Sequence, residues 1–242
     1  MALGPIGAIA PIPPSKPTTD AENTMIKRPL SYRLKLFLIA VAALIGGYFA
    51  GHYFARPDLK NLSAVMMPKP IPVQPFELTD FNGKRFDAGR LKGHWSFVFF
   101  GYTHCPDVCP TTLSELARVF NRLADDPALQ QNTEFVFVSV DPKRDTPEQL
   151  KTFVHYFNPG FLAATGDDEQ LTRFAKQLFV VYQRDDANGG DDYDVAHSAN
   201  ISLIDPDGNF VAAFKGVHDP KRIAADFKQI VKYWNWSHDN FF

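Results

Sequence analysis

The sequence of 242 residues contains only two cysteines, Cys105 and Cys109, and no run of charges of a single sign. Two cysteines are too few for a disulfide framework, so a hydrophobic core must stabilise the fold, and the two thiols are free for chemistry. The 45% hydrophobic content suits such a core. A formal net charge of -2, with acidic and basic residues scattered along the chain, argues against a nucleic-acid-binding surface.

An uncharged run of 20 residues, from Leu36 to Ala55, lies near the N-terminus. As a helix rising about 1.5 Å per residue it covers a hydrocarbon core of about 30 Å. A cleaved signal peptide is the alternative, but the small residues Ala50 and Ala55 have Tyr48 and Tyr53 two positions upstream, where cleavage needs small side chains. We therefore expect a retained transmembrane anchor.

Charge and composition on either side of this run predict its orientation. Lys27, Arg28, Arg33 and Lys35 precede it and only Arg56 follows closely, which places the N-terminus in the cytoplasm. The tail before the run is rich in proline and small residues and is expected to be disordered. The segment after the run, MMPKPIPVQP, is expected to be an extended spacer that holds the domain off the membrane.

The rest of the chain alternates strand and helix patterns. Asn82-Gly83 lies between two short apolar runs and predicts a type I′ hairpin from Phe76 to Phe86. The unbroken apolar runs 95–100 and 134–140 predict central strands, and the helical spacing of apolar residues over 111–124 makes a βαβ unit of them. Later patterns predict three helices, over 147–157, 167–178 and 220–234, and three strands, over 179–183, 201–204 and 209–214.

This order describes an α/β fold: a mixed sheet with helices on both faces and an N-terminal hairpin, preceded by one transmembrane helix. It is the layout of a thioredoxin-like domain. Cys105 and Cys109 lie at the carboxyl end of an early central strand. In sheets of this kind, ligands and reactive groups are commonly found at such strand ends.

The spacing of Cys105 and Cys109 leaves three interpretations open: a structural disulfide, a redox couple or a pair of metal ligands. In a helical turn, residues i and i+4 share a face with their Cβ atoms about 5–6 Å apart, which suits all three. A disulfide across so short a loop adds little stability. A helix N-terminus stabilises thiolate, so we expect at least one unusually acidic thiol.

A metal site needs a further ligand, because two sulfurs rarely saturate an ion. His104 is adjacent but projects to a different side of the turn. His197 comes just before an apolar strand, in a segment that can approach the cysteines, although spacing alone favours a buried structural histidine. The remaining histidines lie in the membrane run or in surface-like settings: His52, His94, His155, His218 and His238.

Three motifs together resemble the Sco/SenC family of copper chaperones: GYTHCPDVCPTTL at 101–113, VSVDPKRDTP at 138–147 and DYDVAHS at 192–198. The resemblance spans about residues 70 to 235. It implies a membrane-tethered thioredoxin-fold domain that delivers copper to the dinuclear Cu-A centre of cytochrome c oxidase, reduces the cysteines of that centre, or does both. It also implies Cys105, Cys109 and His197 as the metal ligands, which reverses the interpretation of His197.

The chemistry of this donor set agrees with copper. Two soft thiolates and one imidazole suit Cu(I) and can also hold Cu(II), whereas a closed structural zinc site normally needs a fourth protein ligand. Binding requires deprotonated thiolates and a neutral imidazole. Affinity should therefore fall on acidification and be lost when the cysteines form a disulfide.

The chain departs from the family pattern at Ala196, where many members carry an acidic residue before the histidine. Asp192 or Asp194 could compensate for the missing acid.

Four other residues of the motifs have structural interpretations. Asp141, Arg144 and Asp145 are interpreted first as a loop network and second as a partner surface. Asp107 is interpreted as helix-start chemistry rather than a proton carrier.

The leading hypothesis is a metallochaperone rather than an enzyme, with the Cu-A subunit and other copper or thiol-redox proteins of the same compartment as partners. The alternatives are a periplasmic thiol:disulfide oxidoreductase, which uses Cys105 and Cys109 as a redox pair, and a redox or copper sensor. We expect a single-pass protein of the inner (plasma) membrane with its C-terminal domain in the periplasm or an equivalent compartment. The expected segments are a cytoplasmic tail, an anchor, a spacer, the copper-binding domain and a C-terminal tail, over residues 1–33, 34–55, 56–72, 73–236 and 237–242.

Overall fold

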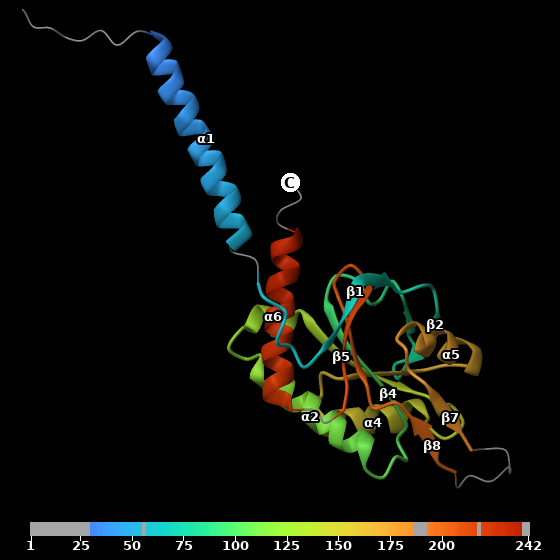
Figure 1. Cartoon of the computed structure of the whole chain (residues 1–242). Helices are drawn as coiled ribbons and strands as arrows, with labels where there is room; N and C mark the ends of the chain where they lie inside the picture. Colours follow the sequence, from blue (N-terminus) through green and yellow to red (C-terminus); the bar gives the residue numbers. More distant parts are fainter. Residues whose placement is uncertain (1–29, 55–56, 186–192, 217–218, 239–242) are drawn as a thin grey trace, which may run out of the picture. The chain divides into compact units, whose positions relative to one another are not determined.

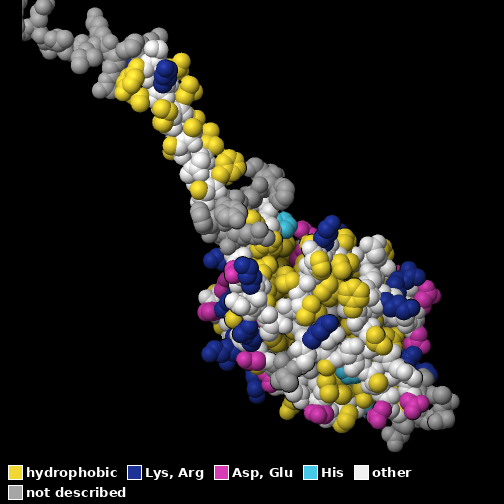
Figure 2. Space-filling view, viewed as in Figure 1, with side chains coloured by type: hydrophobic (Ala, Val, Ile, Leu, Met, Phe, Trp, Pro, Cys, Tyr) yellow, Lys and Arg dark blue, Asp and Glu magenta, His cyan; other side chains and the backbone are white. Residues whose placement is uncertain are grey.

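The computed structural model describes residues 30–54, 57–185, 193–216 and 219–238 (Figure 1). The chain consists of two units, residues 1–55 and 56–242. The described part of the first unit is helix α1 (Leu30–Phe54). Its Ser31–Gly51 stretch is the one helical stretch among the described residues with the length and apolar composition of a membrane span, and none of it is buried. Figure 2 shows the apolar side chains that coat this helix.

The second unit is built on an eight-stranded mixed sheet with the order β1-β10-β9-β4-β5-β6-β2-β3. Strands β4, β5 and β6 run parallel, and the other neighbours are antiparallel. A separate two-stranded sheet joins β7 and β8. The strands are β1 (Val65–Pro72), β2 (Glu77–Asp80), β3 (Arg85–Asp87), β4 (Trp95–Gly101), β5 (Thr133–Ser139), β6 (Leu162–Thr165), β7 (Tyr182–Arg184), β8 (Val195–His197), β9 (Ile201–Ile204) and β10 (Asn209–Phe214).

Helices cover both faces of this sheet. Phe97 of β4 packs against Phe227 of α6, with ring centroids 4.9 Å apart, and α6 contacts α2. Phe100 points to the opposite face and packs against Phe174 of α5 at 5.4 Å. The helices are α2 (Val108–Arg122), α3 (Pro127–Gln131), α4 (Pro147–Phe157), α5 (Asp168–Gln177) and α6 (Pro220–His238). This arrangement confirms the predicted α/β fold.

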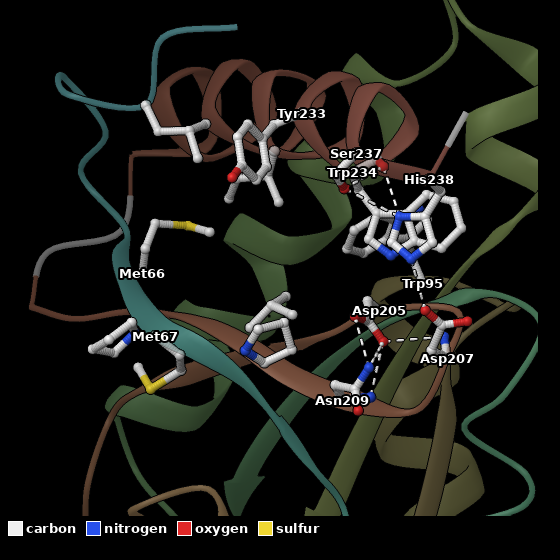
Figure 3. A pocket seen from close by; sticks show the side chains of 15 residues that line it. Met66, Met67, Trp95, Asp205, Asp207, Asn209, Tyr233, Trp234, Ser237 and His238 are labelled. Atoms are coloured by element: carbon white, nitrogen blue, oxygen red, sulfur yellow. Dashed lines mark hydrogen bonds and ion pairs between the residues drawn. The ribbon is translucent and has the colours of Figure 1, made fainter. Parts of the chain in front are cut away.

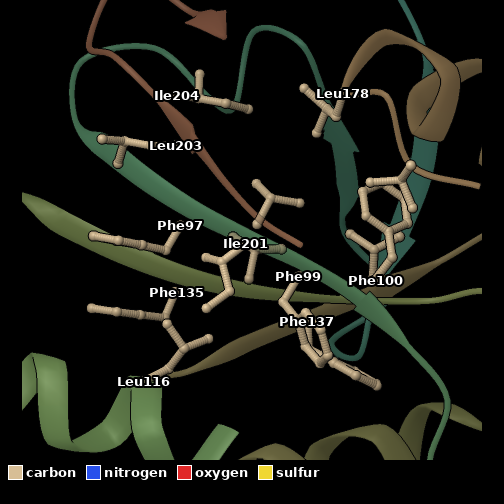
Figure 4. Packing of buried hydrophobic residues seen from close by; sticks show 14 of the residues in the cluster. Phe97, Phe99, Phe100, Leu116, Phe135, Phe137, Leu178, Ile201, Leu203 and Ile204 are labelled. Atoms are coloured by element: carbon tan, nitrogen blue, oxygen red, sulfur yellow. The ribbon is translucent and has the colours of Figure 1, made fainter. Parts of the chain in front are cut away.

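The central strands have the continuous apolar sequence that burial on both faces requires. Every residue of β4 is buried, and Phe97 stacks on Phe135 of the parallel neighbour β5 with ring centroids 4.9 Å apart (Figure 4). Leu116 of α2 closes this layer of the core. The rigid end of β4 therefore fixes where the cysteine segment begins.

The predicted hairpin is present, but the prediction of a type I′ turn is wrong. A type I′ turn needs positive φ at both central residues, and in this loop only Gly83 has it, with φ 75°. The N–H of Gly83 donates to the carbonyl of Asp80, and the N–H of Asp80 donates to the carbonyl of Lys84. The loop is therefore a three-residue connection with glycine at its left-handed position, a geometry that the Asn-Gly pair also permits.

Two predicted boundaries also need correction. Residues 65–72, expected within the spacer, form β1, the edge strand of the large sheet, which pairs with β10. Proline is tolerated there because an edge strand has one unpaired side. The closing helix continues to His238, beyond the predicted end of the domain at 236. Residues 1–29 and 239–242 of the predicted tails lie outside the described residues.

Candidate metal centre

The cysteine segment follows the buried strand β4, as the sequence predicted. Cys105 lies half-buried in the loop after this strand, and Cys109 is fully buried in the first turn of α2. The backbone N–H of Cys109 donates to the sulfur of Cys105 at 3.4 Å. Since the first N–H groups of a helix have no partner within it, the Cys105 sulfur acts as a capping acceptor.

Asp107 occupies the N-cap position of α2, but its carboxylate makes no capping hydrogen bond. It accepts instead from the Thr111 hydroxyl at 3.4 Å. The predicted helix-start role is therefore correct in position, while the capping acceptor is the Cys105 sulfur.

Gly101, at the end of β4, makes room for the buried sulfur. A Cβ atom at this position would lie 2.6 Å from Cys109 Sγ and 2.8 Å from the Phe137 ring. Sequence reasoning missed this residue, although a glycine directly before a cysteine loop is a signal of close backbone approach.

The histidine comes from a different part of the fold. His197 ends β8, which pairs with β7 in the two-stranded sheet, and its Nε2 lies 3.3 Å from Cys109 Sγ. The rings of Phe99 and Tyr102 flank the imidazole edge-on, with centroids 5.9 and 6.0 Å away. The fold thus brings His197 into contact with Cys109, although the two residues are 88 positions apart in the sequence.

The donor atoms of Cys105, Cys109 and His197 all lie within 4.8 Å of one another, and no other such group of three His, Cys, Asp or Glu occurs among the residues that the structure describes. Two N or S donors on one ion, at about 2.0–2.3 Å each, are at most about 4.6 Å apart. Small side-chain movements therefore suffice for all three to bind one ion.

The neighbouring His104 stays apart from this group, as expected. Its Nδ1 lies 3.2 Å from the Thr103 hydroxyl and 3.6 Å from the Asp145 carboxylate. Three other histidines with described side chains contact other residues: His94 contacts Glu134, His155 contacts Phe81 and His238 contacts Asp207. His218 and the His52 side chain lie outside the described residues.

The two thiols have opposite acidities. The pKa of Cys105 falls to about 4, chiefly because the Cys109 side chain hydrogen-bonds to its sulfur; the backbone N–H groups of Cys109 and Asp107 and the His197 side chain add to this, and burial opposes it. The pKa of Cys109 rises above its ordinary value because its S–H donates to Cys105, it is buried, and it lies beside the Cys105 charge. This confirms the predicted acidic thiol: the reduced pair is one thiolate and one thiol.

Asp145 holds the cysteine segment from behind. Its buried carboxylate accepts from the backbone N–H of Thr103 at 3.0 Å, the Thr103 hydroxyl at 2.6 Å and the Ser139 hydroxyl at 2.6 Å. The predicted loop network is thus confirmed for this residue, and it orients the loop that carries Cys105.

A cavity of about 240 Å³ lies apart from this site, between β1 and α6 (Figure 3), and none of the predicted ligands lines it. Several of its polar groups are engaged with one another. His238 Nδ1 lies 2.8 Å from the backbone carbonyl of Trp234, and its Nε2 lies 3.0 Å from the Asp207 carboxylate. The Asp205 carboxylate accepts a hydrogen bond from the Asn209 amide. The cavity therefore offers no free donor set comparable with the cysteine site.

The sequence profile of the SCO1/SenC family matches residues 66–232, more than two thirds of the chain. The chain belongs to this family. A Stutzerimonas stutzeri protein named for copper binding is 40% identical over 151 residues, which are 62% of this chain and 72% of that protein. The human mitochondrial protein SCO1 homolog is 30% identical over 214 residues, 87% of this chain and 70% of that protein.

Solved structures give the same result for the fold. The structure of Bradyrhizobium japonicum ScoI with copper bound is 38% identical and superposes with a TM-score of 0.58, covering 65% of this chain and 98% of that one. A SCO1/SenC domain with a thioredoxin-like fold therefore carries the cysteine site.

Ala196, where the family resemblance led us to expect an acid, is exposed and faces away from the site. Side chains alternate along a strand, and in β8 Val195 is buried and His197 approaches Cys109. Asp194 is also exposed and shares the outward face with Ala196. An acid on this face would point away from the imidazole. Asp192, the other candidate, lies outside the described residues.

Proposed function

We propose that this chain binds copper through Cys105, Cys109 and His197 and serves the assembly of cytochrome c oxidase. The observation that carries the proposal is the convergence of two sulfurs and one imidazole within 4.8 Å. Soft thiolates with an imidazole match the ligand preference of copper. Membership of the SCO1/SenC family and the copper-bound structure of a relative support the same assignment.

The three residues have separable tasks in capturing the ion. Cys105 is half-buried and already a thiolate, so it makes the first bond to incoming copper. Cys109 lies beneath it and releases its proton as it binds, and His197 Nε2 completes the site. Three protein ligands leave a position for a donor of the accepting protein, which suits transfer to the Cu-A subunit.

The acidity of Cys105 favours reduction of the Cu-A cysteines as a second candidate function. The Cys105 thiolate attacks one sulfur of the partner's disulfide and releases the other as a thiolate. Cys109 then loses its proton and attacks the Cys105 sulfur, which releases the second partner thiolate and leaves a Cys105–Cys109 disulfide. Two electrons pass to the partner.

We further propose that residues 34–55 remain as a single membrane anchor with the N-terminus in the cytoplasm, so that the copper site lies in the periplasm or an equivalent compartment. Support comes from the Ser31–Gly51 helix and the basic residues that precede the apolar run. Because β1 already belongs to the sheet, the copper-binding domain begins at or before Val65.

Copper titration of the reduced full chain in detergent tests the site. We expect one copper per chain for the unaltered protein. His197→Ala should lose most Cu(II) affinity and change the Cu(II) spectrum. His104→Ala is the matched control, since this nearby imidazole contacts Asp145 rather than the sulfurs, and it should bind normally. If His197→Ala leaves the Cu(II) affinity and spectrum unchanged, His197 is not the third copper ligand.

Mixing experiments separate the two candidate functions. Copper-loaded and copper-free protein are each added to the Cu-A subunit in its reduced and in its oxidised form, and copper and free thiols are followed together. Transfer predicts copper movement to the reduced subunit without thiol loss. Reduction predicts that copper-free protein loses two thiols for each disulfide opened in the oxidised subunit. If neither copper movement nor thiol loss occurs with either form of the subunit, both proposed functions are contradicted.

A further inference from the structure

The two halves of the copper site belong to separate sheets. Cys105 and Cys109 follow β4 of the eight-stranded sheet, whereas His197 lies in the two-stranded sheet of β7 and β8, and no backbone pairing joins these sheets among the described residues. Residues 198–200 connect β8 to β9, which pairs with β4, so the backbone brings His197 near the cysteine segment, and side-chain contacts set the remaining approach of the imidazole to the sulfurs.

Tyr193, two residues before β8, makes the principal contacts between the histidine sheet and the loop after β5. Its hydroxyl donates to Asp141 Oδ1 at 2.5 Å, and Asp141 has no exposed side-chain surface. The Arg144 guanidinium lies 3.6 Å from the Tyr193 ring centroid and donates from Nε to the other Asp141 oxygen at 2.5 Å. Tyr193 is thus held at its hydroxyl and at its ring face.

The same loop also contacts β7, the other strand of the small sheet. Arg184, in β7, donates to the carbonyl of Val140 at 3.2 Å. Strand β7 pairs with β8 in a register that sets Tyr182 opposite His197 and Arg184 opposite Val195. One attachment therefore lies before β8 and the other lies on its partner strand.

The cysteine half is attached to this loop by a different residue. Asp145 accepts from Thr103 and Ser139, and its own backbone N–H donates to the carbonyl of Asp141 at 3.0 Å. One turn thus presents two carboxylates, with Asp141 on the histidine side and Asp145 on the cysteine side.

We propose that Tyr193 and Asp141 are positioning residues that hold His197 at bonding distance from the sulfurs, independently of the attachment of the cysteine loop to Asp145. The inference rests on the proposed copper site and adds to it a separate control of the third ligand. Cu(I) is held largely by two soft thiolates, whereas Cu(II) prefers nitrogen donors and higher coordination. Loss of the Tyr193 hydroxyl should therefore weaken Cu(II) binding far more than Cu(I) binding.

The test is Tyr193→Phe, which keeps the ring beneath Arg144 and removes only the hydroxyl. A hydrogen bond to a charged group is worth enough to lower the population of the binding-competent histidine about tenfold or more. We expect the Cu(II) dissociation constant to rise about tenfold while that of Cu(I) changes less than about threefold. Tyr156→Phe is the matched control, since Tyr156 is 83% exposed, and it should change neither.

A metal-free measurement distinguishes failure of this inference from failure of the copper site. In reduced protein without copper, proton contacts between the His197 ring and the flanking Phe99 and Tyr102 rings are followed by NMR. Tyr193→Phe should lose or weaken these contacts, and Tyr156→Phe should keep them. If Tyr193→Phe retains these contacts and its Cu(II) affinity is unchanged, the positioning role is wrong. If the unaltered chain binds no copper, the copper site is wrong, and the NMR result alone tests the positioning role.

Two further variants complete the test. Thr103→Val removes a donor to Asp145 on the cysteine side and should weaken Cu(I) and Cu(II) binding by similar factors. If Thr103→Val and Tyr193→Phe give the same pattern, the two attachments are not independent and the inference is wrong. If Tyr193→Phe does not fold, Asp141→Asn takes its place: the amide oxygen still accepts from Tyr193, while the uncharged amide gives Arg144 Nε an NH2 group in place of its acceptor, and a loss confined to Cu(II) is expected.

Discussion

Gly101→Ala tests the close packing on which the buried half of the copper site depends. The added Cβ would lie 2.6 Å from Cys109 Sγ and 2.8 Å from the Phe137 ring. These distances are about 1 Å shorter than the roughly 3.5–4.0 Å at which non-bonded heavy atoms attract. Neither neighbour can yield freely, because Cys109 and Phe137 are both almost fully buried.

The cost follows from this crowding. Overpacking of a well-filled core costs about 1–3 kcal/mol, which lowers the Tm of a domain of this size by about 2–4 °C per kcal/mol. The displaced Cys109 sulfur should also weaken binding of both copper states. Thermal unfolding of the reduced, metal-free chain measures the first effect, and competition titration measures the second.

Gly160→Ala is the matched control for this prediction. Its Cβ would meet only the end of the half-buried Asn158 side chain, at 3.2 Å, and its φ is not positive. We expect little change in Tm or copper affinity. A Gly101→Ala protein as stable as the Gly160→Ala protein, with unchanged copper affinity, refutes the reasoning.

Three further predictions follow from the site. Alkylation of Cys105, mapped by mass spectrometry, should be nearly independent of pH above about 6, because its pKa is about 4; a rate that climbs through pH 8 contradicts this. Between pH 7 and 8, log affinity for Cu(I) should rise by about one per pH unit, since of the two thiols Cys105 is already deprotonated and Cys109, whose pKa is raised, still has a proton to release; a slope of two in competition titrations contradicts the thiolate–thiol pair. Asp145→Ala should destabilise the metal-free domain by about 2–5 kcal/mol in denaturant unfolding, because donors of Thr103 and Ser139 lose their acceptor; a loss below about 1 kcal/mol contradicts the role of this carboxylate.

Much of the fold could be predicted because its signals are local. The apolar runs that became β4 and β5 are too continuous for any setting but the centre of a sheet, and Ile201–Ile204 and Asn209–Phe214 were predicted with their observed bounds. The strands that were missed, β1, β6 and β8, are short, proline-rich or at an edge. Their pairing depends on neighbours distant in sequence, so no local pattern marks them.

The sequence by itself determined the chemistry of the site: two cysteines at a strand end, a helix start beside them and a matching histidine motif. The tertiary structure decided which donors meet, which thiol is acidic and which residues hold them. Cys109 is the weaker acid because Cys105 and the core surround it, and His197 reaches it because a separate sheet is attached through Tyr193 and Asp141. Distances and burial arise from contacts between segments far apart in sequence, and residue order alone does not encode them in any local pattern.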